Sequence, residues 1–372
     1  MRFLIAGLVC LAIGLSITEY TRRNPPKKDG ETSETTPETK DDGPKKPKWP
    51  APIASLLELD AAGTDTSGPA ADFATLLTVP TDAAVAGFAP VVGGTYVAHH
   101  LVGAFGASVF VIDAAGRSGI VRAEQGSPAK LLFVKETPFT ALDVDGSTLF
   151  FASNGVVGET LARGGEPITV RARFKNATVT SIAASGDVLV LTVMPKSADP
   201  MSTDAVGAVV ALSNTGELSL IAGEVVRPRG AQTDGKDAWW ISGETGGLWR
   251  GALDGAFTSQ LVDKADEPLL LDGDVLYFRA PLGSGTELKR VGRAGGNLAS
   301  LITADVGYLA ATSGLIRFTT TGAGAGLLEM TSGAEATKLL ALPGAGRGLA
   351  VGGTTLFLLT QGDDGRSVLW AK

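Results

Sequence analysis

A short pattern recurs seven times along the chain, and it constrains the fold more than any other sequence feature. Each copy has a modest apolar strand, a turn containing glycine, and then a stronger apolar strand, as in "LDVDGSTLFFAS" and "LLLDGDVLYFRA". Hairpin turns favour glycine because they need a positive φ, which glycine adopts without strain. The pattern therefore predicts an array of β-hairpins. The turn glycines are Gly94, Gly146, Gly186, Gly235, Gly273, Gly314 and Gly353, separated by 52, 40, 49, 38, 41 and 39 residues.

The spacing near 40 residues indicates how many strands each repeat contains. Further apolar segments follow each hairpin, for example "GAVVALSNTG" and "LSLIAGEV" after the third one. Four antiparallel strands of this total length make one blade of a β-propeller. The sequence therefore predicts an all-β fold, a seven-bladed β-propeller of four-stranded antiparallel blades.

The last repeat ends with "RSVLWAK" and has no fourth strand. An unpaired strand would leave an open sheet edge, which native proteins avoid. The apolar segment "DFATLLTVP", from Asp72 to Pro80, precedes the first repeat and has no other place in this scheme. We expect this N-terminal strand, at about 72–80, to pair with Ser367–Trp370 and close the ring.

A second signature lies within the repeats, the stretch "G-x-x-L-Y/F-F" at Gly146–Phe151 and Gly273–Phe278. With the repeat length and the hairpin glycines, it makes residues 72–372 resemble the β-propeller class, loosely the YWTD-, NHL- and TolB-type repeat propellers. The resemblance implies that ligands bind where the loops between second and third strands, and between blades, surround the central channel. Repeated WD, kelch or Asp-box signatures are absent from the sequence, so the specific family stays open.

The N-terminal residues differ in character from the repeats. Residues 1–18 have a positive start and an apolar run over residues 3–17, which predicts a signal peptide or an N-terminal membrane anchor. Cleavage, retention as an anchor and lipidation at Cys10 remain alternatives. Residues 19–71 are rich in Pro, Thr, Lys and Glu, which predicts a disordered linker. We therefore expect an exported protein, periplasmic or extracellular, with the propeller at 72–372.

Charge and composition limit the possible functions. The net charge is −7, so the protein is not expected to bind nucleic acid. The chain has two histidines and one cysteine and lacks the common nucleophile, zinc and nucleotide-binding motifs, so we expect no cofactor and no metal. The acidic turn at Asp143–Gly146 has the look of a calcium loop, but a hairpin turn explains it fully.

The candidate binding residues are polar residues expected near the channel. The longest loop, Met194–Gly207, joins a second strand to a third, and loops of this length are often functional. The only two histidines are adjacent, so they point to opposite faces of a strand and do not suit one metal. The candidates for a binding face are His99, His100, Lys196, Asp199, Asp204, Glu244 and Arg279.

Two functions fit these features. The first is a noncatalytic, envelope-tethered scaffold with a monomeric body that binds an envelope protein or a glycan. The alternative is a propeller-type hydrolase or lyase that acts on a carbohydrate or lactone with channel carboxylates. Two or more carboxylates with shifted pKa values around the channel would favour the enzyme. An apolar or aromatic patch without convergent polar groups would favour the scaffold.

Overall fold

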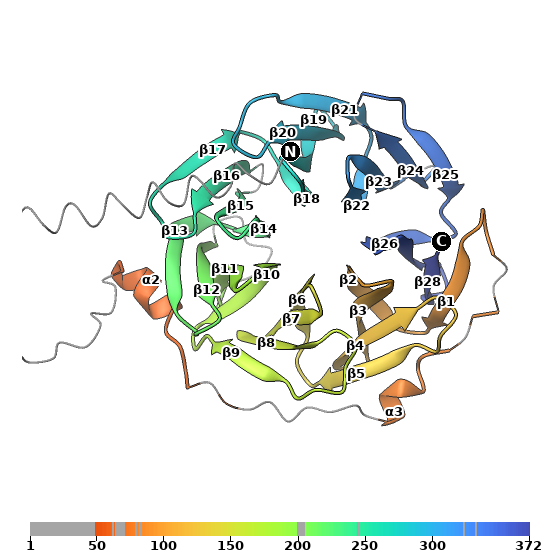
Figure 1. The fold of residues 1–372 in the computed structure, drawn as a ribbon, viewed down its shortest axis with the longest axis horizontal. Helices are drawn as coiled ribbons and strands as arrows, with labels where there is room; N and C mark the ends of the chain where they lie inside the picture. Colours follow the sequence, from red (N-terminus) through yellow and green to blue (C-terminus); the bar gives the residue numbers. More distant parts are fainter. Residues whose placement is uncertain are drawn as a thin grey trace, which may run out of the picture. The chain divides into compact units, whose positions relative to one another are not determined.

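The computed structural model describes residues 49–61, 63, 71–78, 80–81, 84–198, 205–243, 246–322, 324–331 and 333–372. Within them, seven four-stranded antiparallel sheets are arranged in a ring about a central axis, which we call the channel of the propeller (Figure 1). In each of the first six blades the strands follow in chain order from the channel outward. The predicted seven-bladed propeller is therefore confirmed.

The first four blades cover the middle of the sequence. Blade 1 contains β2 (Val97–Ala104), β3 (Ala107–Ala114), β4 (Arg117–Glu124) and β5 (Lys130–Lys135). Blade 2 contains β6 (Phe139–Asp145), β7 (Thr148–Ser153), β8 (Val156–Leu161) and β9 (Thr169–Arg173). Blade 3 contains β10 (Ala177–Ser185), β11 (Val188–Pro195), β12 (Val206–Ser213) and β13 (Leu218–Val226). Blade 4 contains β14 (Arg229–Thr233), β15 (Asp237–Ser242), β16 (Gly247–Ala252) and β17 (Thr258–Val262).

The remaining blades complete the ring. Blade 5 contains β18 (Asp266–Asp272), β19 (Val275–Leu282), β20 (Gly285–Gly292) and β21 (Ala299–Thr303). Blade 6 contains β22 (Val306–Thr312), β23 (Leu315–Thr320), β24 (Gly326–Thr331) and β25 (Thr337–Ala341). Blade 7 contains β26 (Ala345–Gly352), β27 (Thr355–Gln361) and β28 (Ser367–Ala371), together with β1 (Ala89–Gly94) from the N-terminal side.

The ring is closed by an N-terminal strand, as predicted, but the predicted bounds 72–80 are wrong. The closing strand is β1, whose register with β28 runs from Ala89↔Ala371 to Gly94↔Ser367. The segment from Asp72 to Pro80 instead begins within a one-turn helix, α3 (Ala71–Ala74). Its Phe73 is buried against blade 1, where the side chain fills the space that Gly119 leaves open. Packing of this aromatic side chain takes precedence over the strand-like pattern.

The first repeat is also displaced in the chain. Gly94 lies at the end of β1, and the first hairpin of blade 1 turns at Phe105-Gly106. Gly106 has a φ of +76° and precedes Gly146 by 40 residues, so the spacing of 52 disappears. The segment "ASVFVIDAAG" forms the second strand of blade 1. The third strand of this blade is β4, and the repeat pattern does not predict β4. The six other turn glycines do lie in first hairpins with positive φ.

The blades pack on one another through large apolar side chains. Trp239 and Trp240 are buried, at 0% and 1% exposed, as expected for aromatic residues that pack between blades. Phe278 and Phe318 are fully buried in the neighbouring blades. These cores make the ring rigid and hold the channel-lining strands in place.

The described part of the segment before β1 lies along the outer rim of the propeller (Figure 1). It begins with helix α2 (Ala51–Leu56), which buries Ile53, Leu56 and Leu57 in the core of blades 2 and 3. Leu59 then forms a bridge with Phe174, and Lys175 pairs with Glu58 at 2.7 Å. We call residues 49–88 the rim segment.

The rim segment continues past blade 1 to blade 7. Arg117 pairs with Asp72 at 2.5 Å, and its guanidinium lies 5.3 Å from the centroid of the Phe73 ring. Thr78 then exchanges backbone hydrogen bonds with Gly93 of β1, at 2.8 and 3.0 Å. The described parts of this segment thus contact blades 3, 2, 1 and 7 in that order, across the closure of the ring.

The range 19–71, expected to be disordered, therefore includes a helix packed on the propeller. The rest of the predicted N-terminal organisation, residues 1–48, lies outside the described residues. Among the residues that the structure describes, no helix is long and apolar enough to cross a membrane.

Candidate binding site at the channel mouth

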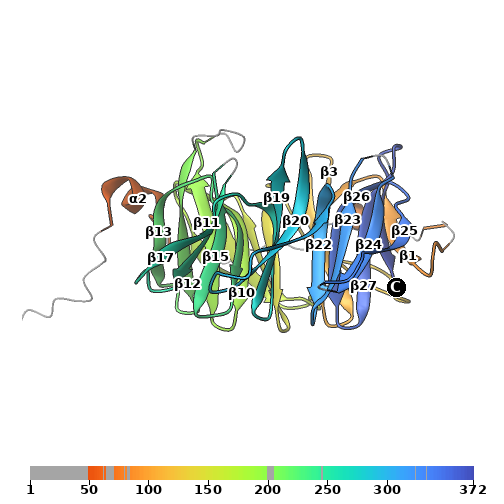
Figure 2. The same ribbon diagram turned by 90° about the horizontal axis from the view of Figure 1, so that it is seen from above.

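The alternation of strand direction defines two faces of the ring, seen edge-on in Figure 2. At one face the innermost strands begin, and loops join second strands to third strands; we call it the strand-start face. At the other face the first hairpin of each blade turns; we call it the hairpin face. The sequence-based expectation places ligands on the strand-start face.

All seven innermost strands share an irregularity near that face. In each blade the register between first and second strand shifts close to the start of the first strand. A bulge adds unpaired residues and re-aims their side chains. Because these strands surround the channel, the bulges form a ring around one of its mouths. The polar residues at the bulges are His100, Thr140, Thr180, Glu267, Tyr308 and Arg347.

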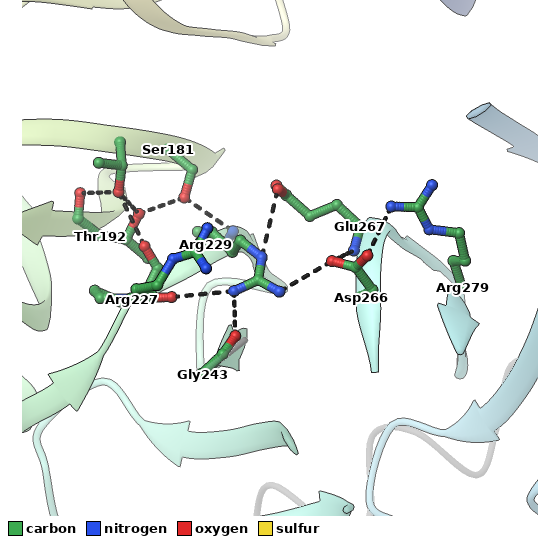
Figure 3. A network of polar contacts seen from close by, with 11 residues as sticks. Ser181, Thr192, Arg227, Arg229, Gly243, Asp266, Glu267 and Arg279 are labelled. Carbon is green, nitrogen blue, oxygen red and sulfur yellow. Dashed lines mark hydrogen bonds and ion pairs between the residues drawn. The ribbon is translucent and has the colours of Figure 1, made fainter. Parts of the chain in front are cut away.

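An ion-pair network joins blades 4 and 5 at this mouth (Figure 3). Asp266 accepts hydrogen bonds from Nη2 of Arg229 at 2.9 Å and from Nη2 of Arg279 at 2.7 Å. Arg229 also donates to the carbonyl of Gly243 at 2.5 Å. Burial alone would raise the pKa of Asp266, but the hydrogen bonds from Arg229 and Arg279 outweigh it and lower the pKa. Asp266 is therefore ionised at neutral pH and fixed between two guanidiniums.

Glu267 follows Asp266 in the chain but has a different environment. Its side chain leans over Gly230, whose missing Cβ would lie 3.3 Å from its Cγ, and it remains 48% exposed. The nearest guanidinium nitrogen is Nε of Arg229, 3.7 Å from its carboxylate. The crowded mouth raises the pKa of Glu267 by desolvation; Arg229, Arg279 and Arg227 oppose this rise and the charge of Asp266 adds to it.

The charged groups continue into blades 6 and 7. Nη1 of Arg279 donates to the carbonyl of Val306 at 3.1 Å, which links blade 5 to the first strand of blade 6. Burial raises the pKa of Tyr308, and the neighbouring charge of Arg347 in blade 7 opposes that rise. We call Arg227, Arg229, Asp266, Glu267, Arg279 and Arg347 the charged arc, which extends over blades 4 to 7.

The two histidines lie on the strand-start face, in the innermost strand of blade 1. Nε2 of His99 lies 2.8 Å from Oδ2 of Asp113, whose Oδ1 accepts from Ser118 at 2.5 Å. His100 has a φ of +50°, and burial, with the neighbouring His99, lowers its pKa to about 4. His100 is therefore neutral at pH 7, and His99 is held by a carboxylate.

Blades 2 and 3 contribute hydroxyls instead of charges. Thr140 donates to the carbonyl of Val179 at 2.6 Å, so it joins blade 2 to blade 3. Thr180 donates to the carbonyl of Pro228 at 3.0 Å, and its hydroxyl lies 2.7 Å from that of Thr192. These side chains are engaged in contacts between and within blades.

The structure brings several predicted candidates to one face. His99, His100, Lys196 and Arg279 all lie at the strand-start face, Lys196 at the end of blade 3's second strand. Asp199, Asp204 and Glu244 lie outside the described residues. Whether any of these residues binds a ligand stays a prediction. Among the described residues, no group of three or more His, Cys, Asp or Glu is arranged to hold a metal ion.

Most of the charged arc was not among the predicted candidates. Arg227, Arg229, Asp266, Glu267 and Arg347 lie immediately before or at the start of innermost strands. The sequence signal was present in "VRPRG", "ADEPLL" and "GAGRG", where charges precede the first strand of a hairpin. A correct assignment of the first strands would have drawn attention to them.

Comparisons with known proteins support the fold only. Neither a protein-family model nor a curated protein matches the chain by sequence. A crystal structure of oligogalacturonate lyase from Vibrio parahaemolyticus is similar, with a TM-score of 0.59 at 12% identity, covering 85% of this chain and 98% of that one. An acylaminoacyl peptidase from Pyrococcus horikoshii gives 0.55 at 12% identity, covering 72% and 49%.

A putative TolB from Agrobacterium tumefaciens gives a TM-score of 0.42 at 16% identity, covering 57% of this chain and 84% of that one. The similarity to the lyase and the peptidase, at 12% identity each, shows a shared fold alone. The chain is a seven-bladed β-propeller whose specific family remains unassigned.

Proposed function

We propose that the protein is a noncatalytic binding propeller that takes its partner, a protein or a glycan, at the mouth on the strand-start face. The observation that carries this proposal is the mutual pairing of the ionisable groups there. Asp266 is held by two guanidiniums and Asp113 by His99 and Ser118. Side chains fixed in this way orient a rigid recognition surface.

Catalysis by general acid and base requires two groups that reach the same substrate atoms. Within the described residues, His99 contacts a carboxylate in blade 1. The carboxylates of the charged arc, Asp266 and Glu267, lie in blade 5. His100 has a lowered pKa and accepts a proton poorly at neutral pH. The pairing pattern supports recognition over turnover.

A second candidate function rests on Asp266 and Glu267. Their environments shift the two pKa values in opposite directions, Asp266 downward and Glu267 upward. Such divergence is found in acid–base pairs, including those that cleave glycosidic bonds. The hydrolase or lyase alternative therefore stays open, with Glu267 as its proton donor.

The proposed tether to the cell envelope rests on the sequence. The apolar run at 3–17 is the feature that supports export, and a binding propeller held near a membrane suits the linker that follows it. Fractionation of cells that produce the full chain tests this: we expect it in the periplasmic, extracellular or membrane fraction. Recovery in the cytoplasm would contradict the proposal.

The binding function is tested by capture from envelope extract with the full chain as bait. The test variant is Arg227→Ala/Glu267→Ala, which removes one half-buried and one exposed charged group of the mouth. The matched control is Arg163→Ala/Glu335→Ala, which removes one charge of each sign from exposed loops at the hairpin face. We expect the control, but not the test variant, to retain the partner. Equal capture by both variants would show that the mouth is not the binding site.

A further inference from the structure

Unmatched donors and acceptors lie next to one another in the charged arc. Among the described residues, the guanidinium of Arg227 has no hydrogen-bond or ion-pair partner. Nε of Arg279 is buried without a partner, although both of its terminal nitrogens are bonded. Within the part of the chain that the structure describes, the carboxylate of Glu267 accepts no side-chain hydrogen bond, and its one ion-pair contact is long, at 3.7 Å.

These groups do not satisfy one another, although the charges of Arg227 and Arg279 both act on Glu267. A carboxylate only accepts and a guanidinium only donates. A ligand that fits between them must donate to the first and accept from the second. A hydroxyl does both with one atom, and neighbouring hydroxyls on a sugar ring present several such atoms in fixed directions.

Two other ligand classes fit less well. A ligand carboxylate or phosphate would approach the guanidiniums but would also meet the charges of Asp266 and Glu267. A protein partner generally anchors itself with apolar or aromatic side chains in buried pockets. Six bulge residues of the mouth are polar, and only His100 and Tyr308 among these six have aromatic rings.

We propose that the channel mouth binds a neutral oligosaccharide, with sugar hydroxyls donating to Glu267 and accepting from Arg227. Because the charged arc includes residues of blades 4, 5 and 7, with Tyr308 of blade 6 near Arg347, the site suits several linked sugars. This inference rests on the proposed function, since it names the partner of the same mouth.

The test uses the full chain and defined probes. Neutral cello-, xylo-, manno- and chito-oligosaccharides of four to six sugars are screened by titration calorimetry, beside a poly-glutamate peptide, an oligogalacturonate and a mixed peptide library. The variants are Arg227→Gln and Glu267→Gln, which keep side-chain size and some hydrogen bonding. The controls are Arg163→Gln and Glu335→Gln at the hairpin face.

We expect one of the neutral probes to bind, about tenfold or more weakly in either mouth variant and unchanged in the controls. Mouth-dependent binding of peptides or of acidic probes, without any neutral saccharide, would overturn this inference and leave the proposed function intact. Cleavage of a bound saccharide would instead overturn the noncatalytic function. If both mouth variants still bind the ligand, its site lies elsewhere. That outcome would contradict both this inference and the proposed function.

Discussion

The two ends of the channel use polar side chains in different ways. At the hairpin face, side chains of one blade accept hydrogen bonds from backbone N–H groups of the next. At the strand-start face, charged side chains pair with one another and leave groups exposed. The contacts at the hairpin face join Asp143 to Ala184 at 2.7 Å, Asp145 to Gly186 at 2.6 Å, Gln232 to Leu271 at 3.2 Å and Asp272 to Gly314 at 2.8 Å.

This difference suggests a division of roles. Backbone amides are fixed by the fold, so a side chain that binds them joins neighbouring blades and contributes to stability. Side chains that bind other side chains can be exchanged without disturbing the backbone. Contacts between blades occur at both faces, but the strand-start face also presents charged groups such as Glu267 to solvent, and these are available for recognition.

The largest effect on stability is expected from a substitution at the hairpin face. Asp143→Ala leaves the N–H groups of Ala184 and Val144 without their acceptor. We expect a loss of about 2–3 kcal/mol in the free energy of unfolding at pH 7, measured by chemical denaturation. Asp143→Asn keeps an acceptor and should recover most of the loss. Unchanged stability in the alanine variant would show that these contacts do not hold the blades together.

A smaller effect is expected at the mouth. Asp266→Ala leaves Arg229 and Arg279 without their shared carboxylate, but both guanidiniums keep carbonyl partners and the site is partly exposed. We expect a loss of about 1–2 kcal/mol in stability. Binding of the oligosaccharide should fall by at least tenfold, because both guanidiniums lose their fixed positions.

Calorimetry and denaturation of Asp266→Ala separate the two roles. Asp143→Ala, measured under conditions where it remains folded, should bind with unchanged affinity. If Asp143→Ala weakens binding as much as Asp266→Ala, the two ends of the channel are not independent.

The pH dependence of stability gives a third test, which concerns Asp143 at the hairpin face. Burial raises the pKa of Asp143 to about 6, and the nearby charge of Asp145 adds to it, against hydrogen bonds from Ala184 and Val144. The folded protein then holds this proton more tightly than the unfolded chain, where the pKa is 3.8. The contribution is present below that value and is lost as the pH rises through 6.

The variant Asp143→Asn isolates this group from the other carboxylates. We expect its stability relative to the native protein to increase by about 2 kcal/mol between pH 4 and pH 7. The measurement is a series of denaturation curves at pH 4, 5, 6 and 7. A constant difference between the two proteins would mean that Asp143 titrates normally.

The sequence predicts the hairpin face better than the mouth, for a physical reason. A hairpin turn requires a positive φ, so glycines such as Gly146 and Gly273 mark it in the sequence. The bulges at the other end are made by residues as different as His100, Thr140 and Glu267, and no residue type marks them. Their positions follow from strand register, which only three-dimensional pairing defines.

The same reasoning explains the error in ring closure. Val92 of β1 and Leu76 of the rim segment are both apolar, and the pattern alone does not tell which pairs with β28. The choice depends on Phe73 packing over Gly119, a contact between distant parts of the chain. The spacing of 52 residues, the largest of the six, was the available signal that the first repeat was misplaced.

The smallest effect on stability is expected at Glu267, and it gives the clearest test of the difference between the two faces. Its pKa is raised in the folded protein, so its charge opposes folding at neutral pH. Because the side chain is 48% exposed, solvent screens much of this cost, and Glu267→Gln should stabilise the protein by only a few tenths of a kcal/mol. The same substitution should weaken saccharide binding about tenfold. A residue whose removal slightly stabilises the fold while it weakens binding has a recognition role, in contrast to Asp143. If Glu267→Gln were destabilising and bound normally, Glu267 would belong with the residues that maintain the ring.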